Sequence, residues 1–513
     1  MGSKKRFAIN SFAQVFAFLV SIGITFFLTP YIVKQLGAAA YGFVGLASNF
    51  VSYIQIITVA LNAMAGRYIT VAAHQGRFDD ARKYFNSVFF SNIALTTIIG
   101  LVSLVLIYYL EFIVHIPAEL IPDVKLLFGC VILNFGISLI FNVYNVSTFI
   151  RNRLDLSSTR LIISNFIKAG SLLALFYIFT PSLWFIGLAT IISTIYVIIT
   201  NIHFCKTLTP ELILSIKFFD TKSIKELLSI GAWSIVGKIA TLLSDGFDLL
   251  LANLYIGPIQ MGILSISRRI PRLTLTLYER INSVFAPPWT KLYAQGKYRE
   301  FHEQILKSIR FFGIISMIPT AFIFSFSDWF YQLWVPSQDA HLLYILTIAG
   351  CIDLPIAMPL QSIYNIFPIT KNIKGNCLFS LGMFSTTFIV ILTALNLIDN
   401  PTYQILFIAG TSASFNVIKS LTFLPLYGSK CAKLKASILY KNSITSILGF
   451  FILLTCMLFI KNYYGDPSWI KLFAAALTTC CIGGITGYII ILNTNDRKEI
   501  LKMVNKFLKK HQT

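Results

Sequence analysis

The sequence predicts an all-α polytopic membrane protein with about 14 transmembrane helices, arranged as two parallel-repeat six-helix lobes plus a C-terminal helix pair. Composition is the first observation: 56% of the 513 residues are hydrophobic and 12% are charged, with a mean hydropathy of +0.74. Soluble domains carry about 25% charged residues. The second observation is a series of apolar runs long enough to span a bilayer. The third is an internal repeat, in which residues 36–78 return as residues 256–298 without a gap.

Each span is predicted from an apolar run that polar or basic residues bound. In chain order the spans cover 7–33, 41–65, 84–110, 122–150, 160–180, 182–205, 227–256, 258–288, 308–334, 340–367, 374–397, 401–426, 439–460 and 468–492. The first run is too long for a cleaved signal peptide, so it is interpreted as the first transmembrane helix.

Basic residues are distributed unevenly between the loops. With the N-terminus in the cytoplasm, and residues at the span ends counted with the adjacent side, 31 of the 42 Lys and Arg fall on the cytoplasmic side. Seven lie deeper within spans, and only Lys34, Lys125, Lys461 and Lys471 fall on the other side. This positive-inside pattern predicts a multi-pass protein with both termini in the cytoplasm. Membrane topology therefore explains the formal net charge of +21, and nucleic-acid binding is not expected.

The repeat predicts how the helices are organised. Gly37 and Gly42 return as Gly257 and Gly262, and residues 75–78 return as residues 295–298. Six spans lie between the starts of the copies, so both copies have the same orientation and are related by an axis along the membrane normal. The predicted domains are an N-terminal lobe (1–206), a C-terminal lobe (222–430), and two additional helices with a basic cytoplasmic tail (431–513).

A polar, periodic loop occurs in both copies, at residues 66–83 and 287–307. Such a pattern predicts a cytoplasmic helix at the membrane interface, broken in the first copy at Gly76. A simple connector at the headgroup level and a gating element are both compatible with it.

Charged residues within the spans are concentrated in the second lobe, where they follow helical spacing. In the seventh span a stripe less than a quarter-turn wide contains Ser234, Lys238, Thr241, Asp245 and Asp248. In the eighth span Arg268, Arg272 and Glu279 lie within about 40° of one another, and Arg269 and Arg280 form a second line. Arg268 is roughly 15 Å from the outer end of its helix, and Pro271 is expected to kink that helix.

These two helices carry five cations and three carboxylates, and an anionic substrate group would balance the excess. Because guanidinium groups bind phosphate in a bidentate manner, the predicted pyrophosphate-binding residues are Arg268, Arg269, Arg272, Lys238 and Arg280. The alternative left open is internal ion pairing, of Lys238 with Asp245 or Asp248 and of Glu279 with the nearby arginines.

Four carboxylates are candidates for coupling transport to H⁺ or Na⁺: Asp353, Asp245, Asp248 and Glu279. Ion pairing with nearby cations explains the presence of Asp245, Asp248 and Glu279 within the spans equally well. Asp353 has no obvious cation on its own helix and lies between Gly350 and Pro355, so it is the best single candidate for a titrating group.

Uncharged polar residues follow single helical faces in the first lobe. The predicted glycan-facing residues are Gln14, Asn49, Ser52, Gln55, Asn62, Asn142 and Asn145. Amides and hydroxyls suit sugar hydroxyl groups, but they also join transmembrane helices to one another.

No catalytic pattern is found in the sequence. The eight cysteines have no metal-ligand or disulfide spacing, and the six histidines form no hydrolase motif. A phosphate-cradling glycine loop is also lacking, so we expect no enzyme activity, no cofactor and no bound metal. Any driving force would come from an ion gradient or from the substrate.

The N-terminal segments resemble a known family. A basic tripeptide at residues 4–6 leads into a long first helix ending in TPYIVKQLGAAAYG (29–42), and AGRYIT (65–70) opens a basic loop. This is similar to the polysaccharide-transporter branch of the multidrug/oligosaccharidyl-lipid/polysaccharide exporter superfamily, which includes O-antigen repeat-unit flippases. The duplicated six-span lobes and the extra terminal pair also match.

The resemblance implies a two-lobe bundle around a cationic cavity in the bacterial inner membrane. It implies that an undecaprenyl-pyrophosphate-linked oligosaccharide, such as an O-antigen, capsule or exopolysaccharide repeat unit, is flipped to the outer leaflet by alternating access. Expected partners are the lipid bilayer, this lipid-linked glycan and a polysaccharide polymerase, and the protein is expected to act as a monomer. Related flippases of the peptidoglycan precursor place arginines in the first two spans. Here none precedes Arg67 within those spans, which disfavours that substrate.

Two other functions are weighed. A cation-coupled multidrug or small-molecule exporter of the same superfamily would place carboxylates in the cavity, but the first six spans contain none apart from Asp123, at the very end of the fourth. A major-facilitator carrier would carry a glycine- and arginine-rich motif after its second span, and residues 66–83 do not. A non-transporting membrane scaffold is grouped with the major-facilitator carrier as one alternative, and both are disfavoured.

Overall fold

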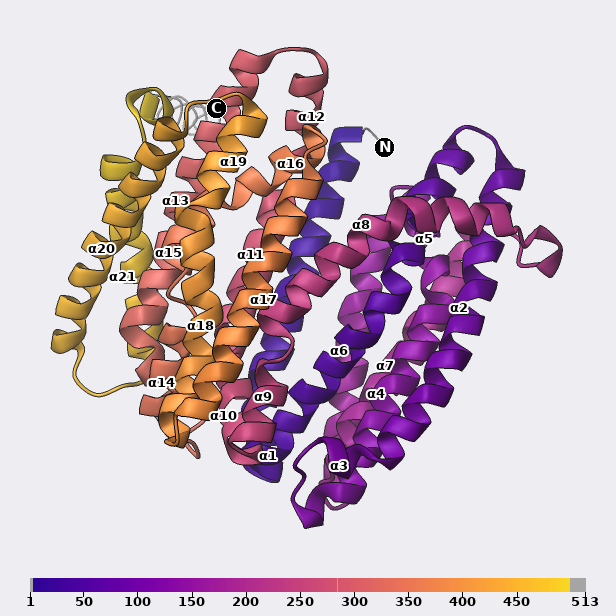
Figure 1. Ribbon diagram of the computed structural model, residues 1–513, viewed down its shortest axis with the longest axis horizontal. Helices are drawn as coiled ribbons and strands as arrows, with labels where there is room; N and C mark the ends of the chain where they lie inside the picture. The colour runs from indigo at the N-terminus through magenta and orange to yellow at the C-terminus, as the bar shows by residue number, and fades with distance from the viewer. Residues whose placement is uncertain (1–2, 284, 499–513) are drawn as a thin grey trace, which may run out of the picture. The chain divides into compact units, whose positions relative to one another are not determined.

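The computed structural model describes residues 3–283 and 285–498, and every element within these ranges is helical (Figure 1). The predicted all-α fold is therefore confirmed. The chain divides into two compact units, Met1–Ser265 and Ile266–Thr513. The repeat assigns residues 222–265 to the second lobe, whereas the first compact unit contains them. The lobe boundaries stay a prediction.

The first unit contains a very long helix and a bundle of shorter ones. Its elements are α1 (Ser3–His74), α2 (Phe78–Tyr108), α3 (Leu110–Ile113), η1 (Ala118–Leu120), α4 (Ile121–Phe141), η2 (Asn142–Asn145), α5 (Val146–Ile150), α6 (Leu154–Ile178), α7 (Phe185–Leu208), η3 (Ile216–Phe218), α8 (Thr221–Asp245), α9 (Asp248–Tyr255) and α10 (Pro258–Ser267), which crosses the unit boundary. The range given for α1 contains two helices that meet at Gly37, where φ is 84° and ψ is 166°, so this non-helical residue separates the first two predicted spans. A positive φ is accessible to glycine because it lacks a Cβ.

The second unit is also helical throughout its described part. Its elements are α11 (Arg269–Ser283), α12 (Ala286–Ala294), α13 (Tyr298–Trp334), α14 (Ala340–Ala349), α15 (Leu354–Ala357), η4 (Met358–Asn365), α16 (Ile366–Ile369), α17 (Ile373–Leu397), α18 (Pro401–Leu421), α19 (Phe423–Ala432), α20 (Ala436–Tyr464), α21 (Trp469–Thr486) and η5 (Gly487–Ile491).

Among the described residues, 11 helical segments are long and apolar enough to cross a membrane. The first of them, Phe12–His74, contains two predicted spans. The predicted seventh and eighth spans are instead interrupted and charged, as α8 with α9 and as α10 with α11. The total of about 14 spans therefore stays a prediction.

The repeat is visible in the backbone. Gly76 and Gly296 have φ values of 72° and 70°, and each ends a helix immediately before the next begins. The predicted break at Gly76 is thus confirmed, although residues 66–74 continue α1 and do not form a separate helix. Gly37 and Gly257 likewise both have positive φ, 84° and 141°.

The two copies contact each other through equivalent residues within the first unit. A Cβ added to Gly262 would lie 2.1 Å from the carbonyl oxygen of Ala38, and one added to Gly42 would lie 2.9 Å from Gly262 Cα. Three residues further along both helices, a Cβ on Gly45 would lie 2.6 Å from Ser265 Oγ. Because equivalent residues meet in the same order, α1 and α10 run in parallel at this contact. This agrees with repeats related by an axis along the membrane normal.

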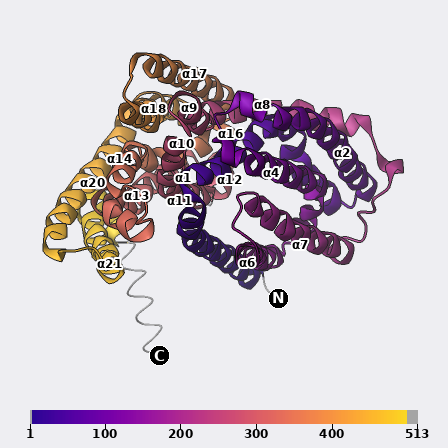
Figure 2. The same ribbon diagram turned by 90° about the horizontal axis from the view of Figure 1, so that it is seen from below.

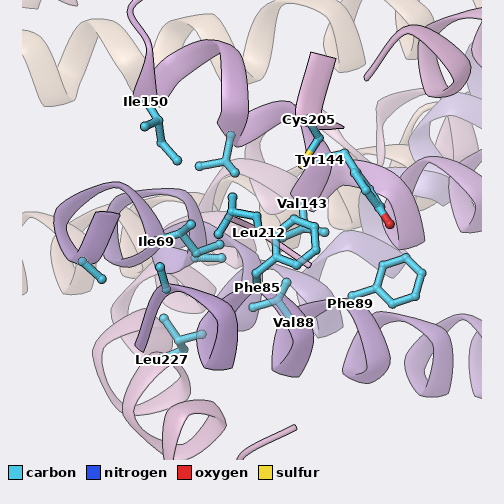
Figure 3. Packing of buried hydrophobic residues seen from close by; sticks show 14 of the residues in the cluster. Ile69, Phe85, Val88, Phe89, Val143, Tyr144, Ile150, Cys205, Leu212 and Leu227 are labelled. Atoms are coloured by element: carbon cyan, nitrogen blue, oxygen red, sulfur yellow. The ribbon is translucent and has the colours of Figure 1, made fainter. Parts of the chain in front are cut away.

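A buried hydrophobic cluster joins helices of the first unit to the linker after α7 (Figure 3). Its members include Ile69, Phe85, Val88, Tyr144, Ile150, Cys205, Leu212 and Leu227. The linker is also held by hydrogen bonds, since Asn86 Nδ2 donates to the Ile213 carbonyl at 2.9 Å and the Ser215 amide donates to Asn86 Oδ1 at 2.8 Å. The linker of residues 209–220 is therefore a packed part of this unit.

The C-terminal helices α20 and α21 pack against α13 in the second unit (Figure 2). Small residues permit the close approach, because a Cβ on Gly313 would lie 2.1 Å from Ser446 Oγ. At one end of this contact Arg310 Nε donates to Asp496 Oδ2 at 2.5 Å, and both residues are buried. The predicted terminal pair is thus an integral part of the unit.

Candidate functional site

The predicted seventh span is interrupted between α8 and α9, at Gly246 and Phe247. The Gly246 carbonyl accepts hydrogen bonds from Asn49 Nδ2, at 2.9 Å, and from the Tyr53 hydroxyl, both on α1. The Tyr53 ring stacks on Phe247, with ring centroids 5.0 Å apart. Backbone groups freed inside a membrane need such partners. Asn49, proposed above as a glycan contact, therefore stabilises this helix break.

The charged stripe of this span lies on both sides of the break. Lys238 is half-buried on α8, and Asp248, at the first position of α9, is 4% exposed. Asp245 is the last residue of α8, and its side chain lies outside the described part of the structure. Pairing of Lys238 with these carboxylates stays a prediction.

The predicted eighth span is interrupted at Arg268, between α10 and α11. Pro271 lies in the first turn of α11, and the kink predicted from it is confirmed. Arg268 Nη2 donates to the Ile408 carbonyl of α18 at 3.5 Å, and Arg268 Nη1 lies 3.4 Å from the position of a Cβ on Gly350. Arg268 therefore reaches the interruption between α14 and α15.

That interruption, at residues 350–353, places Asp353 at the start of α15. Asp353 is 6% exposed, and its Oδ2 accepts a hydrogen bond of 2.5 Å from Asn416 Nδ2 on α18. Arg268 and Asp353 both lie near Cys351, which is between the two helices. The structure thus brings Arg268, a predicted phosphate ligand, and Asp353, a predicted coupling residue, to one helix break. The sequence did not predict this, because no cation lies on the helix of Asp353 itself.

The other predicted residues of α11 differ in exposure. Arg272 and Glu279 are exposed, whereas Arg269 is half-buried. The side chain of Arg280 lies outside the described residues. Arg272 is therefore the most accessible described cation of the predicted pyrophosphate site.

The predicted glycan-facing residues divide into two groups by their contacts. Asn62 is bonded reciprocally to Asn92 of α2, at 3.0 and 3.1 Å, and Ser52 donates to the Ser48 carbonyl of its own helix. Gln14 and Asn142 are exposed, Gln55 is half-buried, and Asn145 is exposed but accepts a hydrogen bond from Arg160. Glycan contact stays a prediction for all seven residues, and Gln14 and Asn142 are the most accessible.

One buried cation, Lys419 of α18, was not assigned a role from the sequence. It is 4% exposed, and its Nζ donates to Ser380 Oγ at 2.8 Å. The rings of Tyr364 and Phe384 lie 5.1 and 5.5 Å from the ammonium group. These contacts solvate the charge, and they come from two other segments of the chain, so no local pattern could have predicted them.

A second cation was overlooked because it lies at the edge of its predicted span. Arg160 of α6 is 8% exposed and donates to Asn145 Oδ1 and Ser157 Oγ. The sequence signal that could have identified Arg160 is the helical spacing that places Ser157, Arg160, Ser164 and Lys168 on one face.

Comparison with known proteins identifies a family and a relative of similar length. Residues 32–338 match the family described as polysaccharide biosynthesis protein. The sequence is 28% identical over 506 residues to the uncharacterized membrane protein EpsK of Bacillus subtilis (strain 168), covering 98% of both chains.

Two solved structures are similar in fold. The lipid II flippase MurJ in an inward closed conformation superposes with a TM-score of 0.66 at 13% identity, covering 94% of this chain and 99% of that chain. A multidrug resistance MATE family transporter in an inward-facing conformation gives a TM-score of 0.63 at 15% identity, covering 81% of this chain and 94% of that chain.

The apolar helices define a multi-pass membrane protein, and its fold is the one seen in these two solved transporters. The chain belongs to the polysaccharide biosynthesis protein family, whose match covers more than half of its length.

Proposed function

We propose that this protein flips an undecaprenyl-pyrophosphate-linked oligosaccharide from the cytoplasmic to the outer leaflet of the bacterial inner membrane by alternating access. The glycan would be an O-antigen, capsule or exopolysaccharide repeat unit. The observation that carries the proposal is the group of arginines at the break between α10 and α11, in a chain of the polysaccharide biosynthesis protein family.

The chemistry of this group suits a pyrophosphate. Arg268, Arg269 and Arg272 occur within five consecutive positions around a helix break, where the backbone also offers polar groups. Guanidinium groups form paired, charge-assisted hydrogen bonds with phosphate oxygens. Arg268 already has protein contacts, so the exposed Arg272 is assigned the principal phosphate contact, with Arg269 and Arg268 adding charge.

Other parts of the proposal follow from the sequence. Gln14 and Asn142, which are exposed, would meet sugar hydroxyl groups. The basic loops would lie in the cytoplasm with both termini. A polysaccharide polymerase would receive the flipped unit.

The test replaces Arg272 in a strain whose own copy of the gene is deleted. Arg272→Ala is expected to reduce surface polysaccharide by about tenfold or more, because losing a hydrogen bond to a charged group costs about 1.5–3 kcal/mol. Immunoblots of membrane fractions would show that the variant is inserted at the normal level. Arg299→Ala is the control, since Arg299 is 94% exposed after α12 and pairs only with Glu303 among the described residues. Normal surface polysaccharide with Arg272→Ala, or drug resistance without any polysaccharide defect on deletion, would contradict the proposal.

A further inference from the structure

The geometry points to a second phosphate-binding site, formed in the first unit by Arg160 of α6 with Asn145 and Ser157. The group it would take is a phosphate or pyrophosphate attached to a lipid. Its identification with the pyrophosphate of the flipped substrate rests on the proposed function, whereas the site itself does not.

Arg160 is a buried cation whose hydrogen-bonding capacity is only partly used. The side chain is 8% exposed, and Nη2 donates to Asn145 Oδ1 at 3.2 Å and to Ser157 Oγ at 3.0 Å. Nη1 is buried and has no hydrogen-bond partner in the described part of the chain. No carboxylate of the described residues pairs with this guanidinium, and the nearby titratable group is the phenol of Tyr196 on α7.

Such an arrangement is costly in an unliganded protein. A buried charge needs a counter-charge, and a buried N–H group without an acceptor loses its hydration without compensation. A buried arginine is otherwise paired, as Arg310 is with Asp496. An anion with several acceptor oxygens would supply both the missing charge and the missing acceptors for Nη1, and phosphate matches the planar guanidinium group best.

The position of the site along α6 fits a lipid phosphate. Arg160 lies six residues after the first residue of α6, or about 9 Å along the helix axis. The headgroup zones extend only several Å beyond a hydrocarbon core of about 30 Å, so this depth is close to their inner boundary. Ser157, Arg160, Ser164 and Lys168 fall within about 80° around α6, so the site opens a polar stripe along one helical face.

Asn145 connects this site to the predicted glycan contacts. It is the last residue of η2, the 3₁₀ turn that begins at the exposed Asn142. A phosphate held by Arg160 would thus lie beside amides that can reach the sugar attached to it.

The experiment uses the purified full-length protein in nanodiscs of phosphatidylcholine, with a photoactivatable short-chain prenyl pyrophosphate as the probe. Cross-linked residues are identified by mass spectrometry. We expect cross-links within residues 142–168, and Arg160→Gln is expected to reduce them by about tenfold or more. Thr159→Ala is the matched control, because Thr159 is the exposed neighbour of Arg160 and bonds only to its own helix. Unchanged cross-linking of this segment in Arg160→Gln would overturn the proposal.

A second variant separates binding from a structural role of Arg160. Arg160→Met keeps much of the side-chain volume and removes the unpaired charge, so its melting temperature is expected to equal or exceed that of the unmodified protein. If Arg160 served only to clamp η2 to α6, this variant would melt at a lower temperature and would still be cross-linked, which would overturn the proposal.

Lipid composition distinguishes the two sources of phosphate. If phospholipid headgroups occupy the site, nanodiscs with phosphatidylglycerol will suppress cross-linking through Arg160, and the site remains supported as a lipid-phosphate site. If cross-linking is unchanged, the prenyl pyrophosphate is the ligand. Failure of the proposed function is seen separately, as normal surface polysaccharide with Arg272→Ala while cross-linking through Arg160 persists.

Discussion

Arg310 and Arg160 are buried to nearly the same extent, with 7% and 8% of their surfaces exposed, but their partners differ. Arg310 of α13 meets the carboxylate of Asp496 and donates from Nη1 to Asn442 Oδ1 at 3.0 Å. Arg160 meets only neutral groups among the described residues. Both arginines lie at the start of predicted spans, 308–334 and 160–180, yet the carboxylate that decides the role of Arg310 is 186 residues away, beyond the reach of any local pattern. Partners therefore separate a structural arginine from a candidate binding residue.

The ion pair of Arg310 is expected to hold the last helices against α13. Arg310→Leu leaves Asp496 buried without a counter-charge and is expected to lower the free energy of unfolding by about 3–5 kcal/mol. The double variant Arg310→Leu/Asp496→Leu is expected to recover most of this loss, because neither charge is then left alone. Arg299→Leu, in the exposed pair with Glu303, is expected to change stability by less than about 1 kcal/mol. Denaturant unfolding of the purified protein measures all three, and equal losses in the single and double variants would contradict the pairing argument.

At the scale of helices, the interruptions decide where polar groups gather. The break at Arg268 was predictable, because Pro271 cannot continue a regular helix through its preceding turn. The break at Gly246 was not, because the run 227–256 is apolar enough to suggest one continuous span. Its stability depends on Asn49 and Tyr53, which α1 brings to the freed carbonyl. A tertiary contact therefore fixes that break.

The contact between α1 and α10 is expected to tolerate no side chain at Gly262. An alanine there would place its Cβ 2.1 Å from the backbone carbonyl of Ala38, so the helices would have to separate. Overpacking of this kind costs about 1–3 kcal/mol, and we expect Gly262→Ala to lower the melting temperature accordingly. Gly170→Ala in α6 is the control, since an added Cβ there has nothing within 4 Å, and it should be neutral or slightly stabilising. Equal melting temperatures for the two variants would show that this helix contact is not tightly packed.

At the scale of the whole molecule, the sequence predicted architecture better than chemistry. Hydropathy and the repeat predicted the all-helical fold, the break at Gly76 and the parallel course of α1 and α10. These features depend on local sequence patterns, and the internal repeat contains them in both copies. The candidate site depends on contacts between distant segments, so the sequence could assign neither Asn62 to its pair with Asn92 nor Arg160 to its buried position. The copies also differ in chemistry, since Ser52 occupies the position equivalent to Arg272.

A last consequence concerns how transport is driven. Asp353 is a buried carboxylate at the break between α14 and α15, bonded to Asn416 and close to the segment that Arg268 contacts. Binding of H⁺ or Na⁺ there would change the charge beside Arg268 and thus the local attraction for a phosphate. Asp353 and Asp248 are both buried, whereas Glu279 is exposed, and Asp353 is the coupling candidate because its own helix carries no cation.

Asp353→Asn fixes the site in a form that resembles the protonated carboxylate. In proteoliposomes we expect the variant to flip a fluorescent lipid-linked oligosaccharide at a rate that no longer responds to an imposed pH or sodium gradient, whereas the unmodified protein responds. Asp399→Asn is the control, because Asp399 is exposed between α17 and α18 and should leave the gradient response intact. If the unmodified protein ignored both gradients and Asp353→Asn were fully active, Asp353 would have no coupling role. The driving force would then come from removal of the flipped glycan by the next step of polysaccharide assembly.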